Sequence, residues 1–252
     1  MSAYLEELFG LRGRTALVTG GSSGIGRAMA FALGRAGARV IPVARRPEPL
    51  RQAAAELAAC GTEVETVAAD LADRSALARV TACADVDILV NAAAVNLRPP
   101  LDQLTESDWD VTLAANLTAP FLLGQHFGPA MVARGWGRII NVVSQQAFRA
   151  YGHSGAYGAA KAGLVGLTRS QAEAWSRHGV TSNAIAPGVV HTPLTEPLFA
   201  DPDLAAGHAR RAMIGRNGVP EDFAGCVVYL ASSSSAAVTG QTLFVDGGYS
   251  AT

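Results

Sequence analysis

Short apolar runs alternate along the chain with longer segments in which apolar residues recur at helical spacing. The apolar runs predict strands at 15–19, 39–44, 63–68, 86–91, 138–143, 181–186 and 242–245. Continuous apolar strands are typical of a parallel sheet that is buried on both faces. The segments between them predict helices at about 24–37, 48–60, 73–83, 106–134, 155–178 and 220–232. This alternation predicts an α/β fold with a doubly wound, seven-stranded parallel sheet and helices on both faces.

Two segments depart from the regular alternation. Pro42 lies inside the second predicted strand, where its missing N–H conflicts with a central position in a sheet. The proline-containing segment 193–216, with a helix-like stretch at 204–213, precedes the last strand and predicts a lid over a binding site. Because no repeat, low-complexity tract or linker divides the chain, we expect a single domain over residues 1–252.

Composition and charge exclude several classes of function. With 20 basic and 21 acidic residues, the chain of 252 residues lacks the strong positive charge that is typical of nucleic-acid binding. Cys60, Cys83 and Cys226 are an odd number without close spacing, which indicates neither a disulfide framework nor a metal site. Glu6 and Glu7 make the N-terminus unlike a secretory signal, and no apolar run is long enough to span a membrane. We therefore expect a cytoplasmic protein with no metal and no membrane or nucleic-acid partner.

A glycine-rich turn follows the first predicted strand directly. The sequence TGGSSGIG occupies residues 19–26, and a predicted helix begins at once. Glycines permit a tight turn, and backbone N–H groups at a helix N-terminus can bind a pyrophosphate. The position between a strand and a helix of the first βαβ unit predicts a dinucleotide site. The expected contacts are Gly20, Ser22, Ser23, Gly24, Ile25 and Gly26.

The end of the second predicted strand distinguishes between the two nicotinamide cofactors. An acidic residue there hydrogen-bonds the adenosine ribose, whereas an arginine accommodates the additional phosphate of NADP(H). This chain has Arg45 and Arg46 at that point and no acidic residue before Glu48. Because a guanidinium fork replaces the carboxylate, we expect NADP(H) to be favoured over NAD(H).

Tyr157 and Lys161 lie four residues apart in a predicted helix and therefore on one face of it. A tyrosine titrates near ~10, which is too high for a base at neutral pH, but a cation within about 4–6 Å stabilises the phenolate. We therefore expect Lys161 and an oxidised nicotinamide to lower the pKa of Tyr157. Ser144 follows the strand at 138–143, at the carboxyl end where ligands bind open α/β sheets. Lys161 is also the only lysine in the chain.

Further motifs occur in order along the chain. They are Asp70-Leu71, Asn91-Ala92-Ala93-Ala94, Asn116, Ser144, Tyr157-x-x-x-Lys161, Pro187-Gly188 with Thr192, and Val245-Asp246-Gly247-Gly248. With TGGSSGIG, and over essentially its whole length, the chain resembles the short-chain dehydrogenase/reductase family. The resemblance implies an NAD(P)-binding Rossmann domain that transfers a hydride between the nicotinamide and a ketone or secondary alcohol. The segment 213–218 is similar to relatives that handle polyols and sugar acids, such as gluconate 5-dehydrogenase.

The resemblance also implies a role for each member of a catalytic set. Tyr157 would be the general acid and base that protonates the carbonyl oxygen during reduction, and Ser144 would polarise that oxygen. Lys161 would lower the pKa of Tyr157 and bind the nicotinamide ribose. Asn116 would hold a water that links Lys161 to solvent. Further implied cofactor contacts are Asp70, Leu71, Asn91, Ala92, Pro187, Gly188, Val190 and Thr192.

For the substrate and the assembly, the resemblance implies a small carbonyl or alcohol substrate and a homotetramer that forms through the helices at 106–134 and 155–178 and the last strand. The implied substrate contacts are Asn96, Gln145, Gln146, Tyr151, His153, Val189 and His191. Because several of these are amides or imidazoles, they favour a polar substrate of polyol or sugar-acid type. A 3-oxoacyl reductase and an NAD-dependent secondary-alcohol dehydrogenase are alternatives, and a cofactor-sensing protein without catalysis is a third.

Two positions depart from the family pattern. The usual Asn-Asn-Ala-Gly is here Asn91-Ala92-Ala93-Ala94, so the methyl group of Ala94 either narrows the nicotinamide pocket or redirects Val95 and Asn96 into it. Ser23 stands where many relatives that prefer NADP(H) carry a basic residue.

Overall fold

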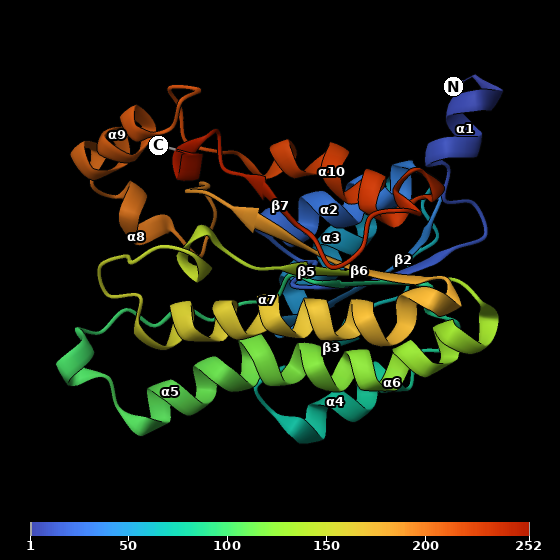
Figure 1. Ribbon diagram of the computed structural model, residues 1–252, viewed down its shortest axis with the longest axis horizontal. Helices are drawn as coiled ribbons and strands as arrows, with labels where there is room; N and C mark the ends of the chain where they lie inside the picture. Colours follow the sequence, from blue (N-terminus) through green and yellow to red (C-terminus); the bar gives the residue numbers. More distant parts are fainter. Residues whose placement is uncertain (1, 252) are drawn as a thin grey trace.

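The computed structural model describes residues 2–251 and is built around one seven-stranded parallel sheet (Figure 1). The strands are β1 (Thr15–Thr19), β2 (Arg39–Ala44), β3 (Val67–Ala68), β4 (Ile88–Asn91), β5 (Gly137–Val142), β6 (Val180–Pro187) and β7 (Thr242–Val245). Their order across the sheet is β3-β2-β1-β4-β5-β6-β7, and neighbouring strands are parallel. The doubly wound sheet predicted from the apolar runs is confirmed.

Helices cover both faces of this sheet, as Figure 1 shows. One face carries α2 (Gly24–Arg35), α3 (Pro47–Ala59) and α10 (Ala224–Ala231). The other face carries α4 (Arg74–Thr81), α5 (Glu106–Leu113), α6 (Ala119–Arg134) and α7 (Gly155–Trp175). A short N-terminal helix that the sequence patterns did not predict, α1 (Ala3–Phe9), precedes β1, and α8 (Glu196–Phe199) and α9 (Pro202–Arg211) follow β6.

Each central strand contributes to two apolar cores, because successive side chains point to opposite faces of a sheet. In β1, Val18 packs with Met29 and Val227 beneath α2 and α10. Its neighbour Leu17 packs with Leu123 beneath α6. Complete burial of such a side chain contributes about 1.5–3 kcal/mol. Burial on both faces explains why β1 is a continuous apolar run in the sequence.

The second and third strands correct two details of the sequence prediction. Regular pairing beside β2 is limited to Val67–Ala68, with an isolated bridge between Val40 and Val64, instead of the predicted strand 63–68. Val40 exchanges backbone hydrogen bonds with this segment, and Pro42, two residues further on, faces the same way. The N–H that Pro42 lacks is therefore missing on the β3 side, where pairing is short, and the pairing with β1 is regular.

The helix predicted at 106–134 is interrupted by a π turn. This turn, Ala114–Thr118, joins α5 to α6. A π turn inserts an extra residue into a helix and occurs frequently at functional sites. Asn116, which the family resemblance assigns to the catalytic set, lies within it. The helix predicted at 220–232 likewise begins with a 3-10 turn, so that α10 is shorter than expected.

The order of the strands determines where the site lies. The order of the strands reverses between β1 and β4: the chain proceeds from β1 outward to β2 and β3, and from β4 outward in the other direction to β5, β6 and β7. At such a reversal a crevice opens at the carboxyl ends of the strands. The loops that follow β1, β4, β5 and β6 converge on this crevice. Within residues 2–251, no helix combines the length and the apolar character needed to cross a bilayer.

Candidate active site

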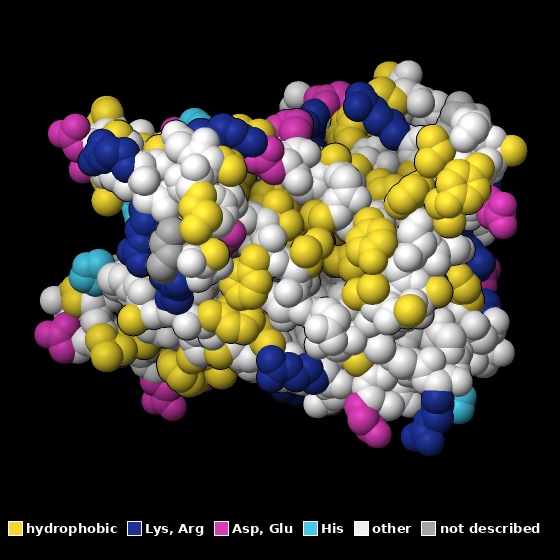
Figure 2. All heavy atoms as spheres, turned by 45° about the horizontal axis from the view of Figure 1, so that its top comes forward, with side chains coloured by type: hydrophobic (Ala, Val, Ile, Leu, Met, Phe, Trp, Pro, Cys, Tyr) yellow, Lys and Arg dark blue, Asp and Glu magenta, His cyan; other side chains and the backbone are white. Residues whose placement is uncertain are grey.

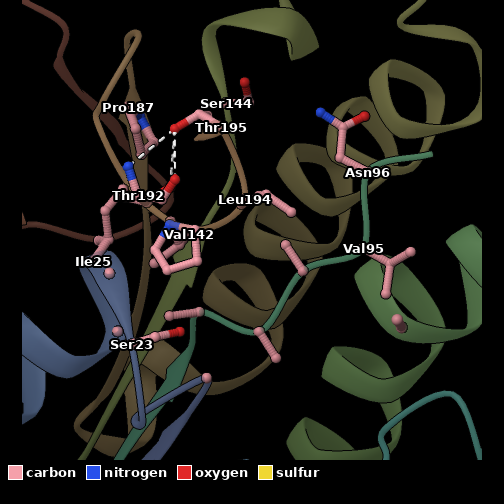
Figure 3. Close-up of a pocket in the computed structure, with 18 of the residues that line it drawn as sticks. Ser23, Ile25, Val95, Asn96, Val142, Ser144, Pro187, Thr192, Leu194 and Thr195 are labelled. Atoms are coloured by element: carbon pink, nitrogen blue, oxygen red, sulfur yellow. Dashed lines mark hydrogen bonds between the residues drawn. The ribbon is translucent and has the colours of Figure 1, made fainter. Parts of the chain in front are cut away.

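A cavity of about 270 Å³ lies at the carboxyl ends of the central strands. Of the cofactor contacts expected from the sequence, all but Asn91 line it, and of the substrate contacts all but His153 and His191 do so. Figure 3 shows Ser23 and Ile25 on one side of this cavity and Asn96 on the other. The structure therefore brings together residues from the glycine turn, the loops after β4 and β5, and the segment after β6.

The glycine turn presents the N-terminus of α2 to the cavity. Gly24 has a φ of +52°, and a Cβ atom there would lie 3.1 Å from the side chain of Thr192. A Cβ atom on Gly26 would lie 2.5 Å from the carbonyl oxygen of Gly20, so this position does not accept a side chain. Ser23 precedes the helix, but its side chain makes no capping hydrogen bond. The uncapped N–H groups of the first turn fit the pyrophosphate of a dinucleotide.

Arg45 and Asp70 form an ion pair at the adenosine end of the cavity, with 3.6 Å between Nη1 and Oδ2. The sequence assigns Arg45 to the additional phosphate and Asp70 to the adenine, and the structure places the two side chains side by side. Asp70 also accepts a hydrogen bond from the backbone N–H of Ala72 at 3.0 Å. An exposed ion pair contributes little to stability, so its main effect is to orient the guanidinium.

Tyr157 and Lys161 project from α7 into the cavity, with the side chain of Tyr157 7% exposed and that of Lys161 1% exposed. The Lys161 Nζ lies 5.6 Å from the centroid of the Tyr157 ring. Burial raises the pKa of Tyr157 to about 12, although the hydrogen bond with Ser144 and the charge of Arg98 oppose this rise. This rise applies without a bound cofactor, whereas the lowered pKa expected from the sequence includes the charge of an oxidised nicotinamide. The cost of burying the phenolate outweighs both opposing effects.

Burial also changes the titration of Lys161. It lowers the pKa of the ammonium to about 7, while Nζ donates a hydrogen bond to the carbonyl oxygen of Val142 at 2.8 Å. Loss of the proton near neutral pH is therefore far easier than for an ordinary lysine. A group that titrates near the working pH is well suited to transfer protons. The charge that stabilises a phenolate at Tyr157 is present only while Lys161 is protonated.

Asn116 is fully buried in the π turn beneath the cavity. Its Nδ2 donates hydrogen bonds to the carbonyl oxygens of Val95 and Thr112, both at 2.8 Å. Its Oδ1 has no hydrogen-bond partner among residues 2–251. The amide is therefore held in one orientation, with an acceptor that remains available to a water. Asn116 does not itself line the cavity, although its neighbour Ala115 does.

The substrate end of the cavity contains two amides. Gln145 is 3% exposed, and neither its Oε1 nor the Oδ1 of Asn96 has a hydrogen-bond partner within the described part of the chain. His153 and His191 instead are exposed and lie outside the cavity lining. His153 belongs to the loop before α7 and has a φ of +57°. The lining of the cavity therefore does not include these two residues, and their contact with a substrate stays a prediction.

Comparison with known proteins identifies the family. A family model described as enoyl-(acyl carrier protein) reductase matches residues 20–250. The gluconate 5-dehydrogenase of Gluconobacter oxydans is 38% identical over 247 residues, which cover 96% of each chain. The chain belongs to the short-chain dehydrogenase/reductase family. It is an NAD(P)-dependent enzyme that acts on CH–OH groups.

Solved structures of other short-chain dehydrogenase/reductases have the same fold. A Beutenbergia cavernae chain, provisionally assigned as an NAD(P)-dependent gluconate 5-dehydrogenase and containing NADP at low occupancy, is 43% identical with a TM-score of 0.94. The match covers 97% of this chain and 99% of that one. The gluconate 5-dehydrogenase of Burkholderia cenocepacia, in complex with NADP and tartrate, is 34% identical with a TM-score of 0.91 and coverages of 98% and 99%.

Sequence reasoning missed the role of Thr19 in this short-chain dehydrogenase/reductase. The buried hydroxyl of Thr19 accepts hydrogen bonds from the N–H groups of Ala92 and Ala93 at 3.0 and 3.1 Å, and it donates to the carbonyl oxygen of Val90 at 3.3 Å. These bonds fix the turn after β4 to the end of β1. Because they use only backbone atoms of the turn, they do not depend on which side chain follows Asn91. A threonine at the end of the first predicted strand, directly before the glycine turn, was the available signal.

Asn91 supports the cavity of the dehydrogenase/reductase from beneath instead of lining it. Its Nδ2 donates to Oδ1 of Asn141 at 2.8 Å. The Nδ2 of Asn141 in turn donates to Thr168 Oγ1 at 3.0 Å and to Gln171 Oε1 at 3.1 Å. These bonds connect β4 to β5 and α7, the helix that bears the tyrosine and the lysine. Hydrogen bonds of this kind rigidify the elements that they join, although Oδ1 of Asn91 itself has no partner among residues 2–251.

Proposed function

We propose that the enzyme transfers a hydride between NADP(H) and the ketone or secondary alcohol of a polyhydroxylated substrate, of polyol or sugar-acid type. The buried amide of Gln145, directly after Ser144, is the observation that carries this proposal. An amide oxygen that is buried without a partner costs about 1–3 kcal/mol. A substrate hydroxyl that donates to this oxygen recovers the cost, whereas a plain ketone does not.

A second acceptor supports the same substrate class. The Oδ1 of Asn96 is also without a partner in the part of the chain that the structure describes, and this residue comes from the loop after β4. In Figure 3, Asn96 lies across the cavity from Thr192 and Pro187. Two acceptors on different walls favour a substrate with more than one hydroxyl. The related enzyme that contains tartrate, a dihydroxy acid, is in accord with this proposal.

Tyr157 is the proposed general acid and base. In reduction, a nicotinamide held at this site would supply the hydride. The Tyr157 hydroxyl donates its proton to the carbonyl oxygen of the substrate. The raised pKa of Tyr157 keeps it protonated for this step, and the Ser144 hydroxyl polarises the same oxygen. The phenolate that results is stabilised by protonated Lys161, which then returns a proton. We propose that a water on Oδ1 of Asn116 connects Lys161 to solvent.

Oxidation uses the same residues in the opposite direction. Tyr157 must then be a phenolate to remove the proton of the substrate hydroxyl. Because burial opposes this form, oxidation requires the positive charges of protonated Lys161 and of the oxidised nicotinamide. The same pair of residues therefore serves both directions, with Tyr157 protonated in one and ionised in the other.

The preference for NADP(H) is tested at Arg45. Arg45→Ala is expected to weaken NADPH binding by about 10- to 100-fold, because charge-assisted hydrogen bonds to a phosphate contribute about 1.5–3 kcal/mol. NADH binding, which uses no such phosphate, is expected to change less than about twofold. Fluorescence titration with both cofactors measures this. Arg51→Ala removes another exposed arginine, on α3, and is the matched control. Tighter binding of NADH than NADPH by the unaltered enzyme would contradict the assignment.

The substrate class is tested with a panel of ketones and NADPH. Polyhydroxy ketones and keto acids are expected to have kcat/KM values at least about 100-fold above those of unsubstituted ketones of equal length. Gln145→Leu is expected to lower kcat/KM for the polyhydroxy compounds by about 10- to 100-fold and to leave plain ketones nearly unchanged. Gln52→Leu, at an exposed position on α3, is the control. A preference for 3-oxoacyl esters or plain ketones that Gln145→Leu does not alter would overturn the proposal.

We also propose that the enzyme is a homotetramer. Leu243 and Phe244 on β7 are 39% and 38% exposed, and Phe148 packs on Phe244 with ring centroids 4.9 Å apart. Figure 2 shows apolar side chains gathered on the face of the molecule that β7 and α10 occupy. On the other side of the sheet, Trp109 and Phe121 are also exposed. Two exposed apolar faces suit an assembly with two kinds of interface. Analytical ultracentrifugation is expected to give a molecular mass about four times the 26.0 kDa of one chain, and a species of 26.0 kDa would contradict the proposal.

A further inference from the structure

A row of three aromatic rings joins the rim of the substrate end to α9. Tyr151 lines the cavity, His208 lies on α9, and Tyr249 lies in the C-terminal 3-10 turn, Tyr249–Ala251. The Tyr151 hydroxyl lies 2.6 Å from Nε2 of His208, and the Tyr249 hydroxyl lies 3.3 Å from Nδ1 of the same ring. The planes of the Tyr151 and His208 rings are within 17° of each other, with centroids 5.6 Å apart. One imidazole therefore bridges two segments that are distant in the sequence.

A guanidinium stands at each end of this row. The Cζ of Arg98 lies 5.6 Å from the centroid of the Tyr151 ring, and the Cζ of Arg211 lies 4.6 Å from that of Tyr249. Burial, together with the charges of Arg98 and Arg211, lowers the pKa of His208. The imidazole is therefore neutral at neutral pH, with one N–H and one lone pair. In this form it donates to one tyrosine hydroxyl and accepts from the other.

The row matters because α9 has few other attachments. None of its residues, Pro202–Arg211, is buried. An apolar helix face usually secures a surface helix, and here that contribution is small. Besides the ring contacts, Nδ2 of Asn217 donates a hydrogen bond to the carbonyl oxygen of Ala205 at 2.9 Å. The His208 bridge is therefore a main connection between α9 and the body of the molecule.

We infer that His208 is a positioning residue, which holds Tyr151 in place at the substrate end and fastens the segment 193–216 over it. The inference rests on the proposed function, which assigns that end of the cavity to the substrate. His208 does not itself line the cavity. Its contribution passes through the Tyr151 hydroxyl on one side and through Tyr249 on the other. Loss of the bridge leaves Tyr151 and α9 mobile, and both then have to be ordered again when a substrate binds.

Hydrogen–deuterium exchange tests the inference without any substrate. In the enzyme with NADPH, the amides of 202–211 are expected to exchange at least about tenfold faster in His208→Phe than in the unaltered enzyme, because two hydrogen bonds that secure the helix are lost. His208→Gln retains one donor and one acceptor and is expected to stay within about threefold of the unaltered rate. His126→Phe, at an exposed position on α6, is the matched control.

A double-mutant cycle then separates a bridge from general destabilisation. Tyr151→Phe is expected to accelerate exchange in α9 in part, and Tyr151→Phe combined with His208→Phe to exchange no faster than His208→Phe alone. With a ketone from the panel, His208→Phe is expected to raise KM about tenfold and to change kcat and the Kd of NADPH less than about threefold.

Equal exchange in His208→Phe and the unaltered enzyme, or fully additive effects of the two substitutions, would overturn the bridge. If no ketone of the panel is reduced, the proposed function fails, while the exchange measurements still decide the role of His208. If His208→Phe does not fold, Tyr151→Phe supplies the variant that loses the hydrogen bond and His208→Gln the one that keeps it. Equal exchange in α9 of Tyr151→Phe and the unaltered enzyme would then overturn the bridge.

Discussion

Replacement of Tyr157 by Phe is expected to lower kcat by about 10²- to 10⁴-fold, the range that positioned general acids contribute. Phenylalanine preserves the ring, which lines the cavity, and removes only the oxygen that is proposed to donate the proton. Tyr157 is buried, and phenylalanine fills nearly the same space, so the fold is expected to be retained. The Kd of NADPH is therefore expected to change only a few-fold. Steady-state kinetics and fluorescence titration measure the two quantities.

Tyr229→Phe on α10 is the control for Tyr157→Phe, since it makes the same chemical change at a distance from the cavity. It is expected to leave kcat within about twofold of the unaltered enzyme, as is usual for a substitution away from the site. If Tyr157→Phe retained activity comparable to that of Tyr229→Phe, Tyr157 would not be the acid. A thermal melt of both variants separates loss of chemistry from loss of folded protein.

Replacement of Lys161 by Arg is expected to lower kcat about 100-fold or more, although the charge is retained. Lys161 is 1% exposed, and its ammonium donates a hydrogen bond to the carbonyl oxygen of Val142 at 2.8 Å. A guanidinium is larger and forked, so it cannot occupy the same point beside the Tyr157 ring. A misplacement of about 1 Å can cost about 10²-fold in rate. A guanidinium also remains charged at neutral pH, whereas burial lowers the pKa of Lys161 to about 7.

Lys161→Met separates the loss of charge from the loss of shape. Methionine fills a similar volume without an ammonium, and the removal of a buried charge is expected to keep or raise the melting temperature. The kcat of this variant is expected to fall at least as far as that of Lys161→Arg, with weaker NADPH binding because the ribose loses its donor. Turnover by Lys161→Arg close to that of the unaltered enzyme would show that any cation at this position suffices.

Some features of the site follow from short stretches of sequence. The strand β1, the glycine turn and the start of α2 lie in one continuous segment, so their local pattern predicts their geometry. Tyr157 and Lys161 share a helix face because the spacing of four residues requires it once the helix forms. The sequence also placed Ser144 at a strand end, and parallel strands end at the same edge of the sheet. Each of these predictions depends on residues close together along the chain.

Other features depended on how distant segments pack. The sequence did not show that burial raises the pKa of Tyr157 in the protein without cofactor, since it shows the neighbouring lysine but not the degree of burial. The helix predicted at 106–134 contains a π turn that no periodicity indicated. Asn91 was expected to contact the cofactor, yet it pairs with Asn141 on the neighbouring strand. His153 was expected at the substrate and is exposed.

By itself, then, the sequence determined the class of fold and the family, because local periodicity and motifs at strand ends indicate both. It also proposed the catalytic set, which stays a prediction. Only the tertiary structure decided that the Gln145 amide is buried without a partner and that Tyr151, His208 and Tyr249 meet. The reason is physical. Burial and contact between residues 41 or 57 positions apart arise from the packing of whole elements, and local preferences contain no information about that packing.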